Sequence, residues 1–473
     1  MLNTPTDKDL AQIASIVGVK NLVQGEALTP YLLEPRDQWQ GTASAVAKPG
    51  STEEVSHILS LCAERRIAVV PISGGTGLVG GQTKPDGSLP LLLSLERMNQ
   101  IRAVLPDDGA IIAEAGCILA DIKQAADDVN RLFPLSLASE GTCRIGGNLA
   151  TNAGGVQVLR YGNARDLVLD VEAVLADGTV MDGTRTLRKD NMGLDLRNLL
   201  IGSEGALAVI TAASLKLYPK PGETVTAMLT VPDPHSGLKL LHAMKDRLGD
   251  EITAFELINK CGLEFLHRFH EGFSDPLSGD PEWRVLIEVI GPKDGGLIGL
   301  FEAAMADLFE QGLATDGVVA NSEAQRQALW WVRETIPEAN RKVGAIVSTD
   351  ISLPMSSLSR FIEKGYEEIA EIDQSLVVNC FGHVGDGNLH YNVFPARGRT
   401  RRDYDNLRAE VKQRIHDLVN EMNGSVSAEH GVGRLKVDDL AKYGDPGRLA
   451  AMRAIKKALD PHGILNPGAV VPT

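Results

Sequence analysis

The sequence predicts an α+β fold with two domains and a C-terminal segment, and three observations support this prediction. A chain of 473 residues is too long for a single hydrophobic core. Residues 1–219 alternate between helical and extended patterns, and the excess glycines fall in a few clusters. After the segment PKPGE (219–223), long apolar stretches predict an antiparallel sheet with helices on one face. We therefore expect domains at 1–219 and 220–420, completed by residues 421–473.

Local patterns define the elements of the first domain. Ser51 followed by Glu54 predicts a capping box and a helix through about Arg65. The dipeptide Asp177-Gly178 predicts the turn of a hairpin within 167–181. The other expected elements are strands at 67–72, 89–95, 110–116 and 207–219 and a helix at 118–131.

The second domain and the C-terminal segment show longer periodic stretches, without internal repeats. Their expected elements are strands at 224–231 and 283–291, helices near 236–248 and 296–313, a helix after 351–358, a hairpin at 376–394 and helices at 403–422 and 446–458.

Charge and cysteine content limit the classes of function. With 47 basic and 62 acidic residues, the net charge is −15, which argues against a nucleic-acid partner and requires a locally basic pocket for an anionic substrate. The five cysteines form no C-x-x-C pair, which is typical of reduced thiols in a cytoplasmic protein. No signal peptide and no transmembrane segment are predicted, so a cytoplasmic location is expected.

Two glycine-rich stretches predict a ligand in the first domain. Gly75-x-Gly77-x-x-Gly80 follows a strand and matches the nicotinamide dinucleotide fingerprint, but the glycines and prolines at 81–90 prevent the helix that this fingerprint must open. Successive backbone N–H groups in such a loop can instead form a nest for phosphate oxygens. The stretch 145–155 offers the same chemistry, so the pair suits a cofactor with a pyrophosphate and a large ring system. Tight turns at sheet edges are the alternative.

The most informative segment is the hairpin at 376–394, where His383 and His390 flank a glycine turn. Asn392 lies two residues after His390 and projects from the same face of its strand. Downstream, Glu429 and His430 stand between small residues. Two histidines and a carboxylate form a three-ligand metal site with an open position, typical of catalytic zinc, and His430 is then the general base. The alternative is a set of polar residues satisfied by hydrogen bonds near a tight turn.

Basic residues near Trp330 and Trp331 are candidates for binding an acidic substrate. Arg333 ends a predicted helical stretch, where its guanidinium could hold a carboxylate through two hydrogen bonds. The alternative is an interfacial arginine packed on Trp330. Weaker candidates are Arg341, Lys342 and Arg434.

Several motifs together resemble the vanillyl-alcohol oxidase family of flavoproteins, and within it the D-2-hydroxy acid dehydrogenases. The motifs span nearly the whole chain in the family's order and are PISGGTGLVGGQ (71–82), IGGNLATNAGG (145–155), LRYGN (159–163), LRKDNMGLDLRNLLIGSEGALAVIT (187–211), FGHVGDGNLHYN (381–392), SAEHGVGRLK (427–436) and ILNPG (464–468). The resemblance implies a two-part FAD-binding domain of this type, an antiparallel-sheet cap domain for the substrate and C-terminal helices.

The resemblance also assigns residues. It implies zinc ligation by His383, His390 and Glu429, a substrate contact by Asn392 and a base in His430. It implies non-covalent FAD binding, because the first loop has no histidine at the position where some relatives attach the flavin. The implied FAD contacts are Pro71, Ser73, Gly74, Gly75, Thr76, Gly77, Leu78, Glu140, Gly141, Gly146, Gly147, Asn152, Gly154, Glu204, Gly205, Ile210 and Asn466.

The substrate pocket departs from the hydroxyglutarate pattern of this family. Arg333 is kept, but Pro337 stands where those enzymes have threonine and Ser348 where they have lysine. The loss of an ammonium group weakens binding of a second carboxylate. D-2-hydroxyglutarate therefore competes with a shorter acid such as D-lactate as the expected substrate.

We thus expect an FAD-dependent D-2-hydroxy acid dehydrogenase that passes electrons to an electron-transfer flavoprotein, a quinone or a cytochrome. The sequence is compatible with a homodimer. Two alternatives are a metal-independent flavoenzyme acting on an aldonolactone or alcohol, and a flavin subunit that only carries electrons within a complex.

Overall fold

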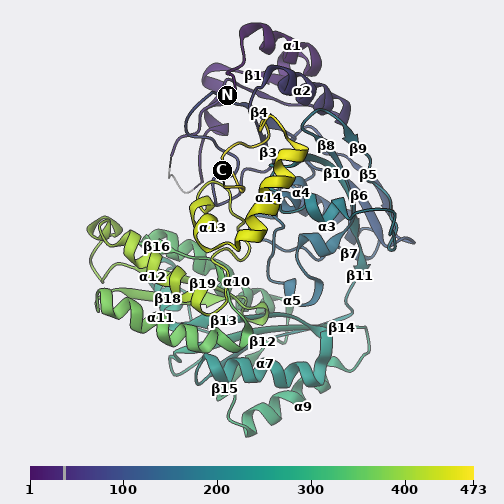
Figure 1. Ribbon diagram of the computed structural model, residues 1–473. Coiled ribbons are helices and arrows are strands. Elements are labelled where there is room, and N and C mark those ends of the chain that lie inside the picture. Colours follow the sequence, from purple (N-terminus) through teal and green to yellow (C-terminus); the bar gives the residue numbers. More distant parts are fainter. Residues whose placement is uncertain (36–38, 473) are drawn as a thin grey trace. The chain divides into compact units, whose positions relative to one another are not determined.

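The computed structural model describes residues 1–35 and 39–472, and the chain divides into two compact units (Figure 1). The first unit comprises Met1–Gly154, Gly162–Lys220 and Glu429–Thr473, and the second comprises Gly155–Tyr161 and Pro221–Ala428. One boundary therefore lies inside the PKPGE segment. The last boundary follows Ala428, whereas the prediction put it after residue 420.

A largely parallel sheet begins the first unit. Within the described residues its strand order is β1 (Leu22–Val23), β2 (Ala45–Ala47), β4 (Leu91–Ser94) and β3 (Val69–Ile72), with β2, β4 and β3 parallel. Strands that run in the same direction need a crossover connection. Helix α2 (Thr52–Arg65) supplies it between β2 and β3, which lie on either side of β4.

The predicted start of α2 is confirmed, but the capping box is only half formed. The Ser51 hydroxyl accepts the Glu54 N–H at 3.2 Å, as predicted. The Glu54 carboxylate, however, accepts from the N–H of Gly50 at 2.7 Å, one residue before the expected Ser51 donor.

The second sheet of the first unit is antiparallel throughout, in the order β5 (Ile101–Leu105), β6 (Ala110–Glu114), β10 (Ala208–Lys216), β8 (Val168–Leu175) and β9 (Val180–Met181). The Asp177-Gly178 turn joins β8 to β9 as predicted, and Gly178 has a φ of +90° that favours glycine there. The remaining elements of this unit are α1 (Asp7–Val17), α3 (Leu119–Asp127), β7 (Arg131–Leu132), α4 (Ile145–Ala150), α6 (Leu196–Leu200), β11 (Tyr218–Pro219), α13 (Val437–Tyr443) and α14 (Pro446–Leu459).

The second unit is built on one antiparallel sheet. Its order in the described chain is β15 (Asp316–Val319), β12 (Glu223–Val231), β14 (Trp283–Gly291), β13 (Ile252–Asn259), β18 (Val377–Gly382), β19 (Asn388–Phe394) and β16 (Val347–Ser348), with β17 (Ile351–Ser352) also paired to β19. The predicted hairpin is confirmed as β18 and β19, with Phe381 opposite His390. The helices are α5 (Val158–Tyr161), α7 (Pro234–Leu248), α8 (Lys260–Phe269), α9 (Leu297–Glu310), α10 (Glu323–Val343), α11 (Leu358–Ile372) and α12 (Arg408–Glu421).

Helices cover both faces of this sheet, so the prediction of one covered face is wrong. Alternate residues of β12 separate the two cores: Ala227 and Leu229 pack with Leu241 of α7 and Phe301 of α9, whereas Met228 belongs to the core of α8 and α10. The sequence did not predict the second covering layer, because α10 directs charged side chains towards the sheet and therefore lacks a clear apolar stripe.

Helix α10 also continues further than expected. Arg333 was predicted at the end of a helical stretch, but the helix runs through Pro337 to Val343. Proline leaves the carbonyl four residues earlier, that of Arg333, without its helical N–H donor. Buried contacts on both sides of Pro337, at Ile336 and Ala339, outweigh this local cost. Among the described residues, no helix is long and apolar enough to cross a membrane.

Candidate active site

A hollow in the first unit is lined by both glycine-rich stretches. Its cavity volume is about 130 Å³, and the hollow is open to solvent. Glycine backbone forms part of its lining. At Gly75, with a φ of +70°, an added Cβ would meet no atom within 4 Å and would project into open space.

The two glycine-rich stretches pack directly on each other. The Gly147 N–H donates to the Ser73 hydroxyl at 3.0 Å. A Cβ on Gly74 would come within 2.8 Å of the Cys143 Cα, and one on Gly147 within 2.9 Å of the Ser73 Cβ. Part of the second stretch, expected as a loop, forms the short helix α4, in which Gly146 permits contact with the backbone of Ala115.

Many of the predicted FAD contacts line this hollow. Those that do are Pro71, Ser73, Gly74, Gly75, Thr76, Gly77, Gly146, Gly147, Glu204, Gly205 and Ile210, and those that do not are Leu78, Glu140, Gly141, Asn152, Gly154 and Asn466. Lining residues missed from the sequence include Gln82, Arg144, Asn148 and Ser203. Residues 73–90 contain no helix, which agrees with the rejection of a nicotinamide fingerprint.

Glu204 links the hollow to the segment that follows Glu429. This buried carboxylate accepts the N–H groups of Val432 at 2.7 Å and Gly433 at 3.0 Å. Burial raises the pKa of the Glu204 carboxyl, although these two donors act in the opposite direction. The Glu204 side chain therefore positions the segment 431–433 within the first unit.

Arg434 and Asn466 have structural partners in the same region. Arg434 donates to the carbonyls of Gly80 and Gly81 and, at 2.7 Å, to the Asn466 side chain. Burial lowers the pKa of Arg434 to about 10. Arg434 was one of the weaker candidates for binding an acidic substrate. In the structure its guanidinium holds backbone and side-chain groups of the first unit. The Asn466 amide donates to the carbonyls of Gly81 and Glu204, so it supports two lining residues of the hollow without lining the hollow itself.

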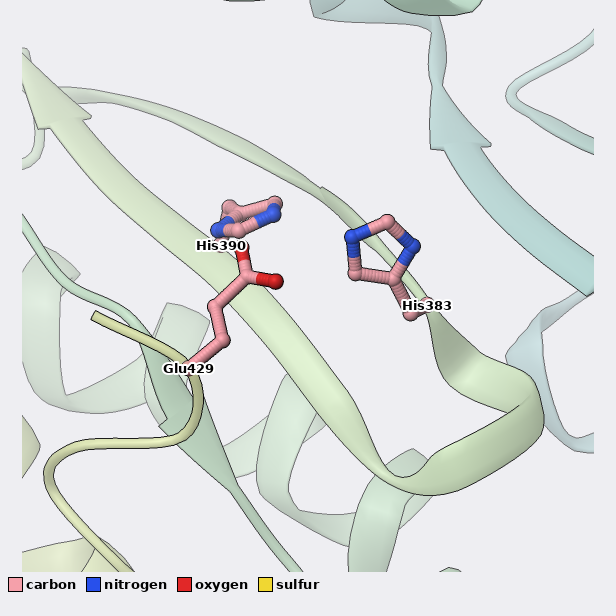
Figure 2. Close-up of side chains that lie close together, drawn as sticks. All are labelled: His383, His390 and Glu429. Carbon is pink, nitrogen blue, oxygen red and sulfur yellow. The ribbon is translucent and has the colours of Figure 1, made fainter. Parts of the chain in front are cut away.

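The three predicted metal ligands come together (Figure 2). One potential ligand atom from each of His383, His390 and Glu429 lies within 4.8 Å of the other two. His383 and His390 project from the two sides of the hairpin turn, and their ring centroids are 5.6 Å apart. Glu429 directly follows Ala428, whose N–H is bonded to the Asp350 carbonyl at 3.2 Å. Two imidazoles and one carboxylate fit a zinc ion and leave coordination positions open.

A fourth residue, Glu256 of β13, supports this group and was missed from the sequence. Its Oε1 lies 2.6 Å from His383 Nδ1, and its Oε2 accepts from Arg333 Nε at 2.7 Å. Burial alone raises the pKa of Glu256, but His383 and Arg333 outweigh burial and hold the pKa well below its ordinary value. The signal available in the sequence was a lone acidic residue inside the apolar stretch ITAFELIN (252–259).

Arg333 is almost fully buried, with 5% of its surface exposed, and it packs on the second unit's own residues. Its guanidinium carbon lies 4.9 Å from the centre of the Phe381 ring, and the alternative of packing on Trp330 stays a prediction. The Trp330 indole instead donates to Glu288 at 2.7 Å. Substrate binding by Arg333 stays a prediction.

The other predicted residues lie on the same sheet or next to Glu429. Asn392 is buried and pairs across strands with Ser348, one of the two positions that depart from the family pattern. Pro337 lies one helical turn after Arg333 on α10. His430 Nε2 is 3.6 Å from Glu429 Oε1. The roles of Asn392 and His430 stay predictions.

Comparison with known proteins agrees with this geometry. Residues 220–470 match the family model for the C-terminal domain of FAD linked oxidases, and residues 43–184 match an FAD binding domain. The chain belongs to the FAD-linked oxidase family. It is an FAD-dependent dehydrogenase, as predicted, and the expected vanillyl-alcohol oxidase type of fold is confirmed.

Individual relatives cover nearly the whole chain. The mitochondrial D-2-hydroxyglutarate dehydrogenase of Arabidopsis thaliana is 36% identical over 98% of this chain and 82% of its own length. A putative mitochondrial D-lactate dehydrogenase of Schizosaccharomyces pombe is 34% identical over 98% of this chain and 90% of its own. A crystal structure of p-cresol methylhydroxylase shares the fold, with a TM-score of 0.78, 17% identity and coverage of 100% and 98%. Both relatives are named as mitochondrial, so they do not support the predicted cytoplasmic location, which stays a prediction.

Proposed function

We propose that the protein oxidises a D-2-hydroxy acid to the 2-oxo acid with the help of a divalent metal, Zn²⁺, held by His383, His390 and Glu429. The observation that carries this proposal is the convergence of these three side chains on one point. Nitrogen and carboxylate ligands in a set of three are typical of catalytic zinc. The names of the relatives support the substrate class.

The residues have separate roles in the proposed reaction. When bound, FAD supplies a hydride acceptor at flavin N5, and the metal supplies a positive charge that lowers the pKa of the substrate hydroxyl. His430 takes the hydroxyl proton as the C2 hydride leaves, so one proton and one hydride are removed. Asn392 binds near the reacting carbon, and Arg333 binds a substrate carboxylate.

Ser348 and Pro337 favour a short acid such as D-lactate over D-2-hydroxyglutarate. A second carboxylate needs charge-assisted donors beyond the reacting end of the substrate. Ser348 supplies no positive charge where lysine stands in the hydroxyglutarate pattern, and Pro337 supplies no hydroxyl where threonine stands. We propose non-covalent FAD, and an electron acceptor that is an electron-transfer flavoprotein, a quinone or a cytochrome.

The test combines metal analysis with a substrate panel. Purified holoenzyme is assayed for bound zinc and then mixed anaerobically with D- and L-2-hydroxy acids while flavin bleaching is followed. We expect about one zinc per chain, bleaching by D-acids only and loss of bleaching after chelation. A protein that binds no zinc and bleaches equally with chelator present would contradict the metal. Absence of bleaching by every 2-hydroxy acid in the panel would favour an aldonolactone or alcohol as the donor.

A further inference from the structure

The Glu256 carboxylate joins two side chains with different expected tasks. Its two oxygens are bonded to His383 Nδ1 at 2.6 Å and to Arg333 Nε at 2.7 Å. Only 1% of Glu256 is exposed. A carboxylate this deeply buried is costly to desolvate, so its retention needs a reason beyond filling space.

The strand register explains why Glu256 meets these two residues. Strands β13 and β18 are antiparallel with Leu257 opposite Gly382, so Glu256 comes beside His383, the next residue along. Alternation along β13 points Glu256, like Ala254 and Ile258, towards the face covered by α10. Arg333 reaches Glu256 from that helix.

A purely structural role for Glu256 would be to hold α10 on the sheet, but a second glutamate already does this. Glu288, in the neighbouring strand β14, accepts from the Trp330 indole at 2.7 Å, from Arg326 at 3.0 Å and from Thr226 at 2.8 Å. None of these three partners belongs to the metal group. Glu288 is thus an internal reference for what a buried glutamate contributes to α10 packing alone.

The bond to His383 has a specific chemical consequence. An ionised carboxylate only accepts hydrogen bonds, so Nδ1 of a neutral His383 must carry the proton. The lone pair then resides on Nε2, the ring atom that would ligate a metal. A carboxylate behind a histidine ligand fixes both the tautomer and the ring orientation.

The bond to Arg333 restricts how that side chain can bind a ligand. Glu256 occupies the Nε side of the guanidinium, and the ring of Phe381 lies 4.9 Å from its central carbon. In the described chain no hydrogen bond of the terminal Nη groups is seen, so this end is the part left for a carboxylate. Arg333 can then form an end-on pair through both Nη atoms.

We propose that Glu256 is a positioning residue that fixes His383 for the metal and Arg333 for the substrate carboxylate, so that one buried side chain sets both subsites. The inference rests on the proposed function. Its consequence is that loss of the Glu256 charge weakens zinc binding and carboxylate binding together, although Glu256 touches neither ligand.

The experiment compares Glu256→Gln with the matched control Glu288→Gln in full-length holoenzyme. Zn²⁺ affinity is measured by competition with a chromophoric chelator, with FAD content and circular dichroism as checks on folding. We expect Glu256→Gln to weaken Zn²⁺ binding by about 10- to 100-fold and to raise KM for D-lactate, whereas Glu288→Gln lowers Tm and leaves Zn²⁺ affinity unchanged. A folded Glu256→Gln variant that binds Zn²⁺ within twofold of the wild type overturns the proposal.

Two further measurements cover the remaining outcomes. If Glu256→Gln does not fold, Glu256→Asp keeps the charge on a shorter arm, and we expect weaker Zn²⁺ binding; unchanged affinity overturns the proposal. The tautomer of His383 is read from long-range ¹H–¹⁵N spectra of histidine-labelled, metal-free protein. We expect Nδ1–H in the wild type and a mixture of the two tautomers in Glu256→Gln, because an amide can both accept from and donate to Nδ1. This readout tests Glu256 even if the wild type binds no Zn²⁺, a result that would instead contradict the proposed function.

Discussion

The hollow of the first unit is formed mainly by backbone, whereas the histidine site of the second unit's hairpin is formed by side chains. The hollow is lined largely by backbone: Gly75 leaves open space where a Cβ would be, and Gly147 lets the two glycine-rich stretches pack closely. The hairpin site is made by side chains, with His383 and His390 supported by a buried carboxylate. The first should therefore be sensitive to added bulk, and the second to lost charge or a lost proton acceptor.

The largest expected effect is on proton removal beside Glu429. His430→Ala should retain FAD but slow flavin reduction by substrate by about 10²- to 10⁴-fold, because a positioned general base contributes a factor of that order. Stopped-flow bleaching under anaerobic conditions measures the rate. Bleaching at the wild-type rate in a variant with normal FAD and zinc content would exclude His430 as the base.

A smaller effect is expected at Ser348, where the hydroxyglutarate pattern has lysine. Ser348→Lys should raise kcat/KM for D-2-hydroxyglutarate relative to D-lactate by about 10-fold or more, since a hydrogen bond to a charged group contributes about 1.5–3 kcal/mol. Ser348→Met supplies a side chain of similar length without charge and serves as the control. If both variants change the ratio equally, charge is not the cause.

The smallest effect tests the glycine-built hollow. Gly75→Ala should weaken FAD binding several-fold, because the new methyl group projects into the hollow. Gly279→Ala is matched to it: Gly279 also has a positive φ, +77°, with no atom within 4 Å of an added Cβ, but it lies outside the hollow. Both variants should lose about 1 kcal/mol of stability from backbone strain. Equal FAD affinity in the two variants would show that the methyl group at residue 75 does not meet the cofactor.

The sequence predicted features whose signal is local. The turn between His383 and His390 is marked by its own glycines, and the glycine-rich stretches lie within a dozen residues each. Glu256 could not be found in this way, because its partners lie far along the chain: the β13–β18 register brings His383 to it, and the packing of α10 brings Arg333.

The wrong prediction of one covered face has a related cause. Helix α10 places Arg326 and Arg333 on the side that meets the sheet, where Glu288 and Glu256 receive them. A helix with charges on its buried side has no clear apolar stripe, so periodicity alone assigns it to the surface. Buried ion pairs of this kind are invisible until both partners are placed.

The first unit is formed by segments that lie before and after most of the second unit in the chain, so these segments are synthesised at different times. The strand β3 pairs through Val69 with the carbonyl of Ile464 and the N–H of Asn466, each at 2.8 Å. The first sheet is synthesised before most of the second unit, whereas these partners are synthesised after it. We therefore expect the second unit to fold before the first unit closes.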